Sequence, residues 1–258
     1  MSTATQRAES VVKRNKLPEP RLDSAISIEK VLCTRRSARE FTNQPLELSQ
    51  VSQMVWAAQG VTGPDAHRTA PSAGGLYALE IYVIAGNLNG LPAGIYKYDV
   101  LTHEVAPLLK GDMRRELSRA ALDQTSLAQA AAIFALSAVY ERITKKYGDR
   151  GVRYAHMEAG HAAQNLLLQA VALDLGAVLV GAFDDAKVKR VLSLSKQEVP
   201  LYLIPVGKPR ETVTHPLYGS GKLPVDSYLL RTRQYRLGCD RGTSCRVSSL
   251  CPPGVPIL

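Results

Sequence analysis

One helical pattern is longer than any other in this chain, and it runs from Tyr154 to Gly176. Its apolar positions are Ala159, Ala163, Leu166, Leu167, Ala170, Val171 and Leu173. They cover more of the helix circumference than a one-sided amphipathic stripe does. Other elements must therefore pack against more than one side of this helix, and Gly176 is expected to end it.

Apolar and β-branched runs predict a sheet of about five strands beside this helix. The runs are 80–85, 94–99, 133–139, 178–182 and 200–206. Helical spacing predicts a helix that starts at a Ser27 cap and ends before Arg35, and a second over Leu48–Ala58 that ends at Gly60. Short helices are expected at 113–121 and 127–131.

The length of 258 residues favours one α+β or α/β unit with extended ends. Residues 1–24 form a polar N-terminal arm, and residues 25–210 form the folded domain. Residues 211–258 have little periodicity. We expect them to form an extension that wraps around another subunit.

The net charge of +9 is spread along the chain. Residues 1–24 carry +2, residues 211–258 carry +3, and the part between them carries +4. This even distribution is typical of a mildly basic solvated surface and disfavours a nucleic-acid-binding arm. No apolar run reaches the roughly 18 residues that span a bilayer, and the N-terminus lacks the apolar core of a signal peptide. We expect a cytoplasmic protein without a membrane partner.

Metal binding is not expected. Cys239, Cys245 and Cys251 are separated by five residues each, which is wider than the Cys-x-x-Cys pairs of zinc sites. His161, Gln164 and Asn165 share one side of the long helix. Since no second His or carboxylate completes a metal pair there, a hydrogen-bonded core or a dimer contact is favoured.

Arg35, Arg36, Ser37 and Arg39 lie within five positions. Guanidinium groups and a hydroxyl can surround a terminal phosphate with charge-assisted hydrogen bonds. Taken alone, the cluster is better explained as a solvated basic turn at a helix C-terminus, where the helix dipole favours cations.

Small residues at Pro71, Ser72, Ala73 and Gly74 precede a predicted strand and would let the backbone approach a planar ring, although a plain turn is an alternative. Further positions lie at the C-terminal ends of two other predicted strands, where ligands of sheet proteins tend to sit. These positions are Gly181, Ala182 and Lys208.

Five motifs in this order resemble the nitroreductase superfamily. They are Arg-Arg-Ser-x-Arg-x-Phe, Ala-Pro-Ser-Ala-Gly-Gly-Leu-Tyr, Lys-Tyr-Gly-Asp-Arg-Gly-Val-Arg-Tyr, Glu-Ala-Gly-His-Ala-Ala-Gln-Asn-Leu and Pro-Val-Gly-Lys-Pro. The resemblance covers about Ser27 to Pro209 and is greatest to dehydrogenases of the SagB/ThcOx/McbC type. It implies an α+β fold with a mostly antiparallel sheet flanked by helices, in a domain-exchanged homodimer.

The resemblance also implies FMN bound at the dimer interface. By motif, Arg35, Arg36, Ser37 and Arg39 would hold the phosphate and ribityl groups, and Pro71 to Gly74 would line the isoalloxazine. Gly181 and Ala182 would pass the ring edge, and Lys208 would return to the phosphate or ribityl group.

The pair Lys146 and Tyr147 occupies the place of a Lys-Tyr pair that assists oxidation of thiazolines and oxazolines in azoline dehydrogenases. The Lys would stabilise the phenolate so that Tyr147 takes the proton while FMN takes the hydride. A solvated cationic loop is the structural alternative for this segment.

Three functions remain open at this point. The first is an FMN-dependent dehydrogenase that acts on an azoline-like or other small heterocycle, either as a small molecule or within a modified peptide. The second is a nitroreductase or quinone reductase that uses NAD(P)H as co-substrate. The third is a non-catalytic subunit of a biosynthetic complex.

Overall fold

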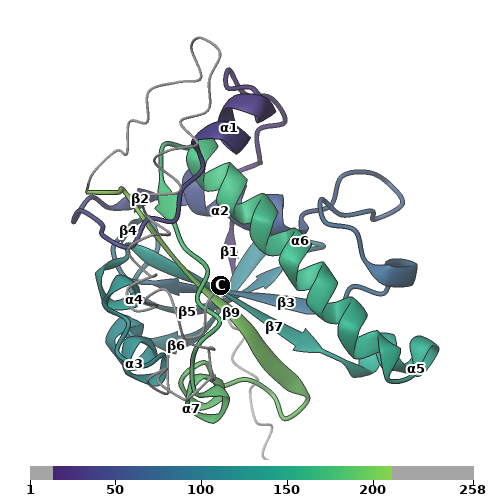
Figure 1. The fold of residues 1–258 in the computed structure, drawn as a ribbon. Helices are drawn as coiled ribbons and strands as arrows, with labels where there is room; N and C mark the ends of the chain where they lie inside the picture. The colour runs from purple at the N-terminus through teal and green to yellow at the C-terminus, as the bar shows by residue number, and fades with distance from the viewer. Residues whose placement is uncertain (1–13, 211–258) are drawn as a thin grey trace, which may run out of the picture. The chain divides into compact units, whose positions relative to one another are not determined.

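The computed structural model describes residues 14–210, which form a seven-stranded sheet covered by helices on both faces (Figure 1). The strand order is β1-β6-β5-β3-β7-β9-β8, and every pairing in this sheet is antiparallel. The strands are β1 Asn15–Lys16, β3 Leu79–Ala85, β5 Gly94–Asp99, β6 Glu104–Lys110, β7 Ala132–Val139, β8 Gly176–Ala177 and β9 Glu198–Gly207. A separate parallel pair joins β2 Leu46–Glu47 to β4 Leu88–Asn89.

The helices fall into two groups, one on each face of the sheet. Their bounds are α1 Ile28–Thr34, α2 Leu48–Gln59, α3 Arg114–Ala120, α4 Thr125–Gln129, α5 Glu141–Tyr147, α6 Arg150–Ala172 and α7 Asp185–Val191, with a 3-10 turn at Ala73–Gly75. Helices α2 and α6 cover one face, while α3, α4 and α7 cover the other.

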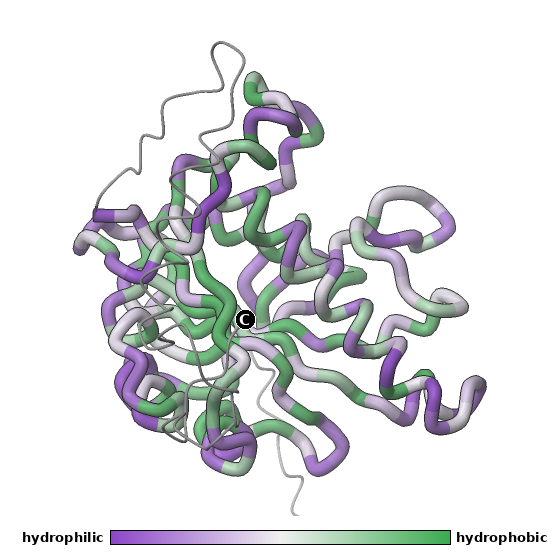
Figure 2. Tube along the Cα trace, in the orientation of Figure 1, coloured by the Kyte–Doolittle hydropathy of each residue, from purple (hydrophilic) through white to green (hydrophobic). Residues whose placement is uncertain are grey.

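Alternating side chains of the central strands supply both cores. In β3, Ile81 and Val83 pack towards α2 and α6, whereas Tyr82 and Ile84 pack in the cluster with α3, α4 and α7. Since both faces are covered, β3 and β7 are buried along nearly their whole length, and Figure 2 shows this concentration of apolar residues at the centre. Because helices cover both faces of the sheet, we expect a ligand site at its edges or strand ends.

The predicted α+β fold with a mostly antiparallel sheet is confirmed, as is the long helix. Helix α6 ends earlier than expected, however, because Asp174 adopts the left-handed conformation with φ of 57°, and the amide of Leu175 returns to the carbonyl of Ala170. Gly176 lies in β8 instead. The Ser27 cap is present, with its hydroxyl accepting from the amide of Lys30 at 3.2 Å.

The expectation of five strands was wrong, because β1 and β6 carry weak local patterns. The predicted strand over 178–182 was also wrong: this run makes only an isolated bridge from Val180 to Leu203, and the edge strand β8 lies just before it at Gly176–Ala177. Strand β6 contains Pro107, which cannot donate to a ladder, and β1 pairs only with its first residues, Glu104 and Val105. The described part of the predicted N-terminal arm thus adds an edge strand, and Leu17 beside it is buried. The predicted extension over 211–258 lies outside the described residues.

Candidate functional site

The arginine cluster follows α1 and runs along the edge of the sheet. The amide of Ala38 donates to the carbonyl of Ala177 at 3.0 Å, and the amide of Thr42 donates to the carbonyl of Lys208 at 2.8 Å. These two hydrogen bonds hold the segment that contains Arg35 to Arg39 at the sheet edge. After the segment leaves α1, it pairs first with β8 and then with the residue that follows β9.

Arg36 also contributes to the end of α1. Its guanidinium donates to the carbonyls of Cys33 at 2.9 Å and Arg35 at 2.7 Å. Cations are favoured at this end of a helix, so the structural interpretation of the cluster is correct for this side chain. Because Arg36 is exposed, its remaining N–H groups stay available to a ligand.

A cavity of about 600 Å³ lies beside this cluster. Arg36, Ser37 and Arg39 line one side of it, and the chain that ends α6 lines the other. Gly176 is needed there, because a Cβ at this position would come within 2.5 Å of the Cβ of Ala38. Lys208 approaches the same region, where its ammonium group contacts the carboxylate of Asp174, a lining residue.

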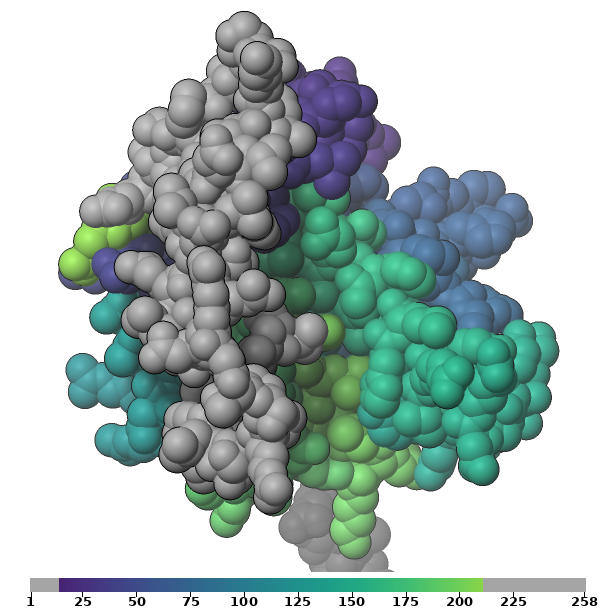
Figure 3. Space-filling model, viewed as in Figure 1, coloured from purple at the N-terminus to yellow at the C-terminus, as the bar shows by residue number. Residues whose placement is uncertain are grey.

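The segment with Pro71 and Ser72 forms a tight loop ahead of β3. Gly74 has φ of 65°, a conformation that glycine adopts without a steric cost. The hydroxyl of Ser72 accepts from the amide of Tyr77 at 2.9 Å and donates to a carboxylate oxygen of Glu158 at 2.6 Å. The loop is therefore closed on itself and attached to α6. Figure 3 shows the neighbouring residues around position 65, in blue, beside the green surface of α6.

Lys146 and Tyr147 lie in the last turn of α5 rather than in a loop, and Lys146 is exposed there. The helix forms because Ile143 is fully buried in the core shared with α6. Both side chains reach Gly74: a Cβ at that position would lie 2.7 Å from the hydroxyl oxygen of Tyr147 and 3.1 Å from Nζ of Lys146. Two predicted groups of site residues, more than 70 positions apart in sequence, are thus in contact.

Aromatic and cationic groups surround this contact. The Tyr147 ring meets that of Tyr154 edge to face with centroids 5.2 Å apart, and Nζ of Lys146 lies 5.4 Å from the Tyr147 centroid. The guanidinium of Arg150 donates to the hydroxyl of Tyr154 at 2.9 Å. Positive charge is therefore placed close to the Tyr147 phenol.

Gly181 and Ala182 follow the short pairing of Val180 with Leu203. Gly181 is exposed, and the carbonyl of Ala182 accepts from Nε2 of Gln124 at 3.0 Å. Among the hydrogen bonds of residues 14–210, none joins these residues to the arginine cluster or to Gly74.

The two clusters lie at opposite ends of α6. Figure 1 shows α1 at one end of this helix and α5 at the other. Since α6 has 23 residues, its length is about 34 Å, comparable to the diameter of a small domain. Within one chain, the arginine cluster and Tyr147 are therefore separated by most of the length of α6.

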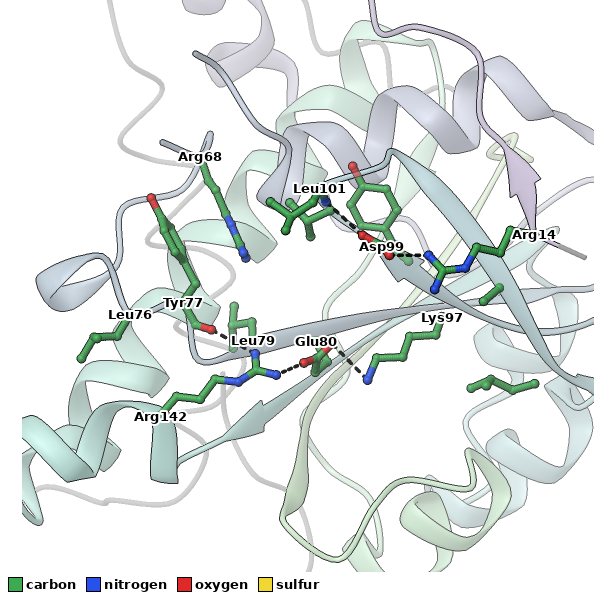
Figure 4. A pocket seen from close by; sticks show the side chains of 14 residues that line it. Arg14, Arg68, Leu76, Tyr77, Leu79, Glu80, Lys97, Asp99, Leu101 and Arg142 are labelled. Carbon is green, nitrogen blue, oxygen red and sulfur yellow. Dashed lines mark hydrogen bonds and ion pairs between the residues drawn. The ribbon is translucent and has the colours of Figure 1, made fainter. Parts of the chain in front are cut away.

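A second cavity of about 570 Å³ adjoins the Gly74 loop (Figure 4). Arg68 stacks over the Tyr77 ring at 4.0 Å, and Arg142 and Lys97 flank Glu80, with Nζ of Lys97 at 3.1 Å. Burial lowers the pKa of Arg68. Within residues 14–210, its Nε is a buried side-chain nitrogen without a protein hydrogen-bond partner.

Sequence reasoning missed Arg68 and Glu158. For Glu158, the signal in the sequence was a carboxylate among the apolar positions of the long helix. The same helix carries the three predicted polar residues His161, Gln164 and Asn165. Nδ2 of Asn165 donates to the carbonyl of Thr69 at 3.2 Å. His161 and Gln164 are exposed.

Within residues 14–210, no group of three or more His, Cys, Asp or Glu side chains could hold a metal ion. Over the same range, each helix is too short or too polar to cross a bilayer.

The fold and these motifs place the chain in the nitroreductase family, to which it belongs: the family profile matches residues 32–208. This is a family of oxidoreductases, so the predicted resemblance is confirmed.

Among known proteins, the chain is similar to one from Methanocaldococcus jannaschii that is provisionally named a nitroreductase. The two are 45% identical over 183 residues, which cover 71% of this chain and 91% of the relative. A solved structure provisionally assigned as a nitroreductase of Ralstonia eutropha has 29% identity and a TM-score of 0.69, and the match covers 77% of this chain and 90% of that one. A chain of the Escherichia coli microcin synthetase complex McbBCD shares the fold, with a TM-score of 0.62 and 22% identity over 82% of this chain and 84% of that one.

Proposed function

We propose that this protein is an FMN-dependent oxidoreductase that works as a homodimer. Each flavin site would combine the arginine cluster of one chain with the Gly74–Tyr147 contact of a second chain. The observation that carries the proposal is the placement of Lys146 and Tyr147 directly against Gly74. The separation of the two clusters by the length of α6 supports a second chain.

The surface of a single chain also supports association. Three large apolar side chains are about half exposed on α1 and α6: Ile28 and Leu32 at 54% each, and Met157 at 51%. The apolar pattern of α6 predicts burial on more than one side, and within residues 14–210 this helix packs against the sheet and α2. A second copy packed against α1 and α6 would bury these residues.

The residues present fit FMN at the phosphate end. Arg36 and Arg39 bring two guanidinium groups to a cavity of about 600 Å³, and Ser37 adds a hydroxyl. Arg35 and Lys208 adjoin the same segment and would add positive charge around a phosphate. At the ring end, Pro71, Ser72, Ala73 and Gly74 would lie under the isoalloxazine, with Gly181 and Ala182 at its edge.

We further propose a dehydrogenase reaction on an azoline-like or other small heterocycle. Oxidation of such a ring to the aromatic azole removes one hydride and one proton. Bound FMN supplies a two-electron acceptor for the hydride. Tyr147 would act as the phenolate, whose oxygen takes the proton to give the neutral phenol, and the ammonium group of Lys146 would lie beside that phenolate. An external acceptor such as dioxygen would take up the two electrons afterwards.

A second candidate is a nitroreductase or quinone reductase that uses NAD(P)H as co-substrate. The name of the Methanocaldococcus jannaschii relative favours it, because that protein is 45% identical to this chain. In this function, NAD(P)H rather than a heterocycle reduces the flavin.

The experiment starts from the absorbance spectrum of the purified full-length protein after FMN is added and excess FMN is removed. A retained flavin spectrum is expected, and a protein that takes up no FMN would reject both enzyme functions. The flavin protein is then mixed with NADPH or NADH without oxygen. Rapid bleaching by either supports the reductase, whereas persistence of the oxidised spectrum with both, followed by bleaching with a thiazoline or oxazoline, supports the dehydrogenase.

A further inference from the structure

The buried carboxylate of Glu158 lies in α6 with 1% of the residue exposed. Among the ion pairs of residues 14–210, none includes it. It is instead held by three hydrogen bonds. Oε2 accepts from the Ser72 hydroxyl at 2.6 Å and from the Ala78 amide at 3.3 Å, and Oε1 accepts from Nε2 of Gln59 at 3.2 Å.

These hydrogen bonds attach both ends of the Ser72–Ala78 loop to α6. Ser72 begins the loop and Ala78 ends it, so a single oxygen of Glu158 fixes the two ends relative to α6. The additional bond from the Tyr77 amide to the Ser72 hydroxyl closes the loop between them. Gly74 lies at the tip, where it meets Tyr147. The distance between the loop and the end of α5 thus depends on one carboxylate.

The guanidinium of Arg68 is connected to the carboxylate of Glu158 through the side-chain amide of Gln59. Arg68 donates from Nη1 to Oε1 of Gln59 at 3.2 Å, and Nε2 of the same Gln59 donates to Glu158. Arg68 and Tyr77 lie together at the edge of the second cavity (Figure 4). A continuous polar path therefore connects that cavity with the loop.

We infer that Glu158 is a positioning residue that sets the Ser72–Ala78 loop for the flavin ring and for Tyr147. This inference rests on the proposed function, in which the same loop lines the isoalloxazine. Charge is required at this position, because three donors point at two carboxylate oxygens. A glutamine has one oxygen and one NH₂ group, so in either orientation its NH₂ would face at least one of those donors.

The test compares Glu158→Gln with Glu198→Gln in the full-length protein. Glu198 is a matched control, since it is 4% exposed and accepts from the hydroxyls of Tyr82 at 2.5 Å and Ser137 at 2.8 Å. These partners lie on β3 and β7, and Tyr82 packs in the core cluster with α3, α4 and α7, on the face opposite α6. Both substitutions remove one buried charge and replace an acceptor with an NH₂ group.

Two measurements separate positioning from general destabilisation. The first is hydrogen–deuterium exchange of the FMN-free protein, in which Glu158→Gln should speed exchange of the Tyr77 and Ala78 amides while Glu198→Gln leaves them unchanged. The second is FMN titration, in which Glu158→Gln should weaken the Kd about tenfold or more, the effect of losing a charged hydrogen bond. Glu198→Gln should stay within about twofold of the wild-type Kd at temperatures below both unfolding transitions.

Equal exchange at the loop in wild type and Glu158→Gln would overturn the inference, as would equal FMN affinity of the two substituted proteins. Ser72→Ala provides a second variant that keeps the charge of Glu158 and removes the bond at the start of the loop. It should raise the same exchange rates, and unchanged rates would also count against the inference. A wild-type chain that binds no FMN would reject the proposed function instead, while the exchange experiment would still test the attachment of the loop.

Discussion

Replacement of Gly74 by alanine tests the contact between the loop and the predicted catalytic pair. The added Cβ would lie 2.7 Å from the hydroxyl oxygen of Tyr147 and 3.1 Å from Nζ of Lys146, whereas the next nearest atom, Cε2 of Tyr147, lies at 3.4 Å. Ordinary contact therefore requires the Tyr147 hydroxyl to move by about 0.7 Å. Both nearest atoms are the ends of flexible side chains, so the loop can remain in place while the pair moves.

The magnitudes follow from these contacts. A non-glycine residue at φ of 65° costs about 1–2 kcal/mol. For a domain of this size, each kcal/mol lowers the Tm by about 2–4 °C. Misplacement of a reacting group by about 1 Å can reduce the rate on the order of 100-fold, so the displaced hydroxyl should lower kcat by roughly 10- to 100-fold.

The neighbouring glycine gives a matched control. Gly75 has the same φ of 65°, but a Cβ there would meet no atom within 4 Å. Gly74→Ala and Gly75→Ala should therefore lose similar stability in thermal unfolding, while only Gly74→Ala loses most of its turnover with saturating FMN. In a Tyr147→Phe background, Gly74→Ala should cause little further loss, because the atom at 2.7 Å is gone.

An equal reduction of kcat in Gly74→Ala and Gly75→Ala would refute the contact between position 74 and the Tyr147 hydroxyl. Additive effects of Gly74→Ala and Tyr147→Phe would also refute it, because they would show that the alanine acts independently of the hydroxyl.

Three other predictions follow from the same structure. Tyr147→Phe should retain FMN and lose turnover of the true substrate by about 100-fold or more, as measured by kcat, and full activity would dispose of its role as proton acceptor. Arg36→Ala should weaken FMN binding by about 1.5–3 kcal/mol, a factor of about 10 to 150 in the Kd from titration, and an unchanged Kd would reject the phosphate role. For Glu198, burial opposes ionisation, but hydrogen bonds from Tyr82 and Ser137 and the charge of Lys97 outweigh it and lower its pKa below 4.5. The resulting stability is present above about pH 4.5 and is lost as the pH falls through the lowered pKa. Glu198→Gln should therefore flatten the fall of Tm in acid. An unchanged dependence of Tm on acid pH would contradict this assignment.

The sequence by itself determined the elements with strong local patterns. The Ser27 hydroxyl caps the first helix as expected, since a cap depends on residues three positions apart. The apolar pattern of α6 and the β-branched run of β3 likewise specify buried elements without knowledge of their partners. Strand β6 was missed because its sequence contains Pro107 and charged residues at both ends, which are unusual for a strand. It forms a strand because it pairs with β5 and β1.

The motif order also indicated the family and the residues that a flavin would contact, although each motif alone had an ordinary structural explanation. Arg36 illustrates this ambiguity, because it does cap the carbonyls at the end of α1 and still lines a cavity. Local sequence could not decide between these roles, since both require the same cation after a helix.

Only the tertiary structure decided which motifs meet. Packing of Ile143 against the core makes the segment before Gly148 a helix, and this packing brings Tyr147 to Gly74 across more than 70 positions of sequence. It also assigns Glu158 to the loop and separates the arginine cluster from Tyr147 by the length of α6. Caps and hydrophobic periods act over a few residues, whereas these distances arise from long-range packing, which no local pattern encodes.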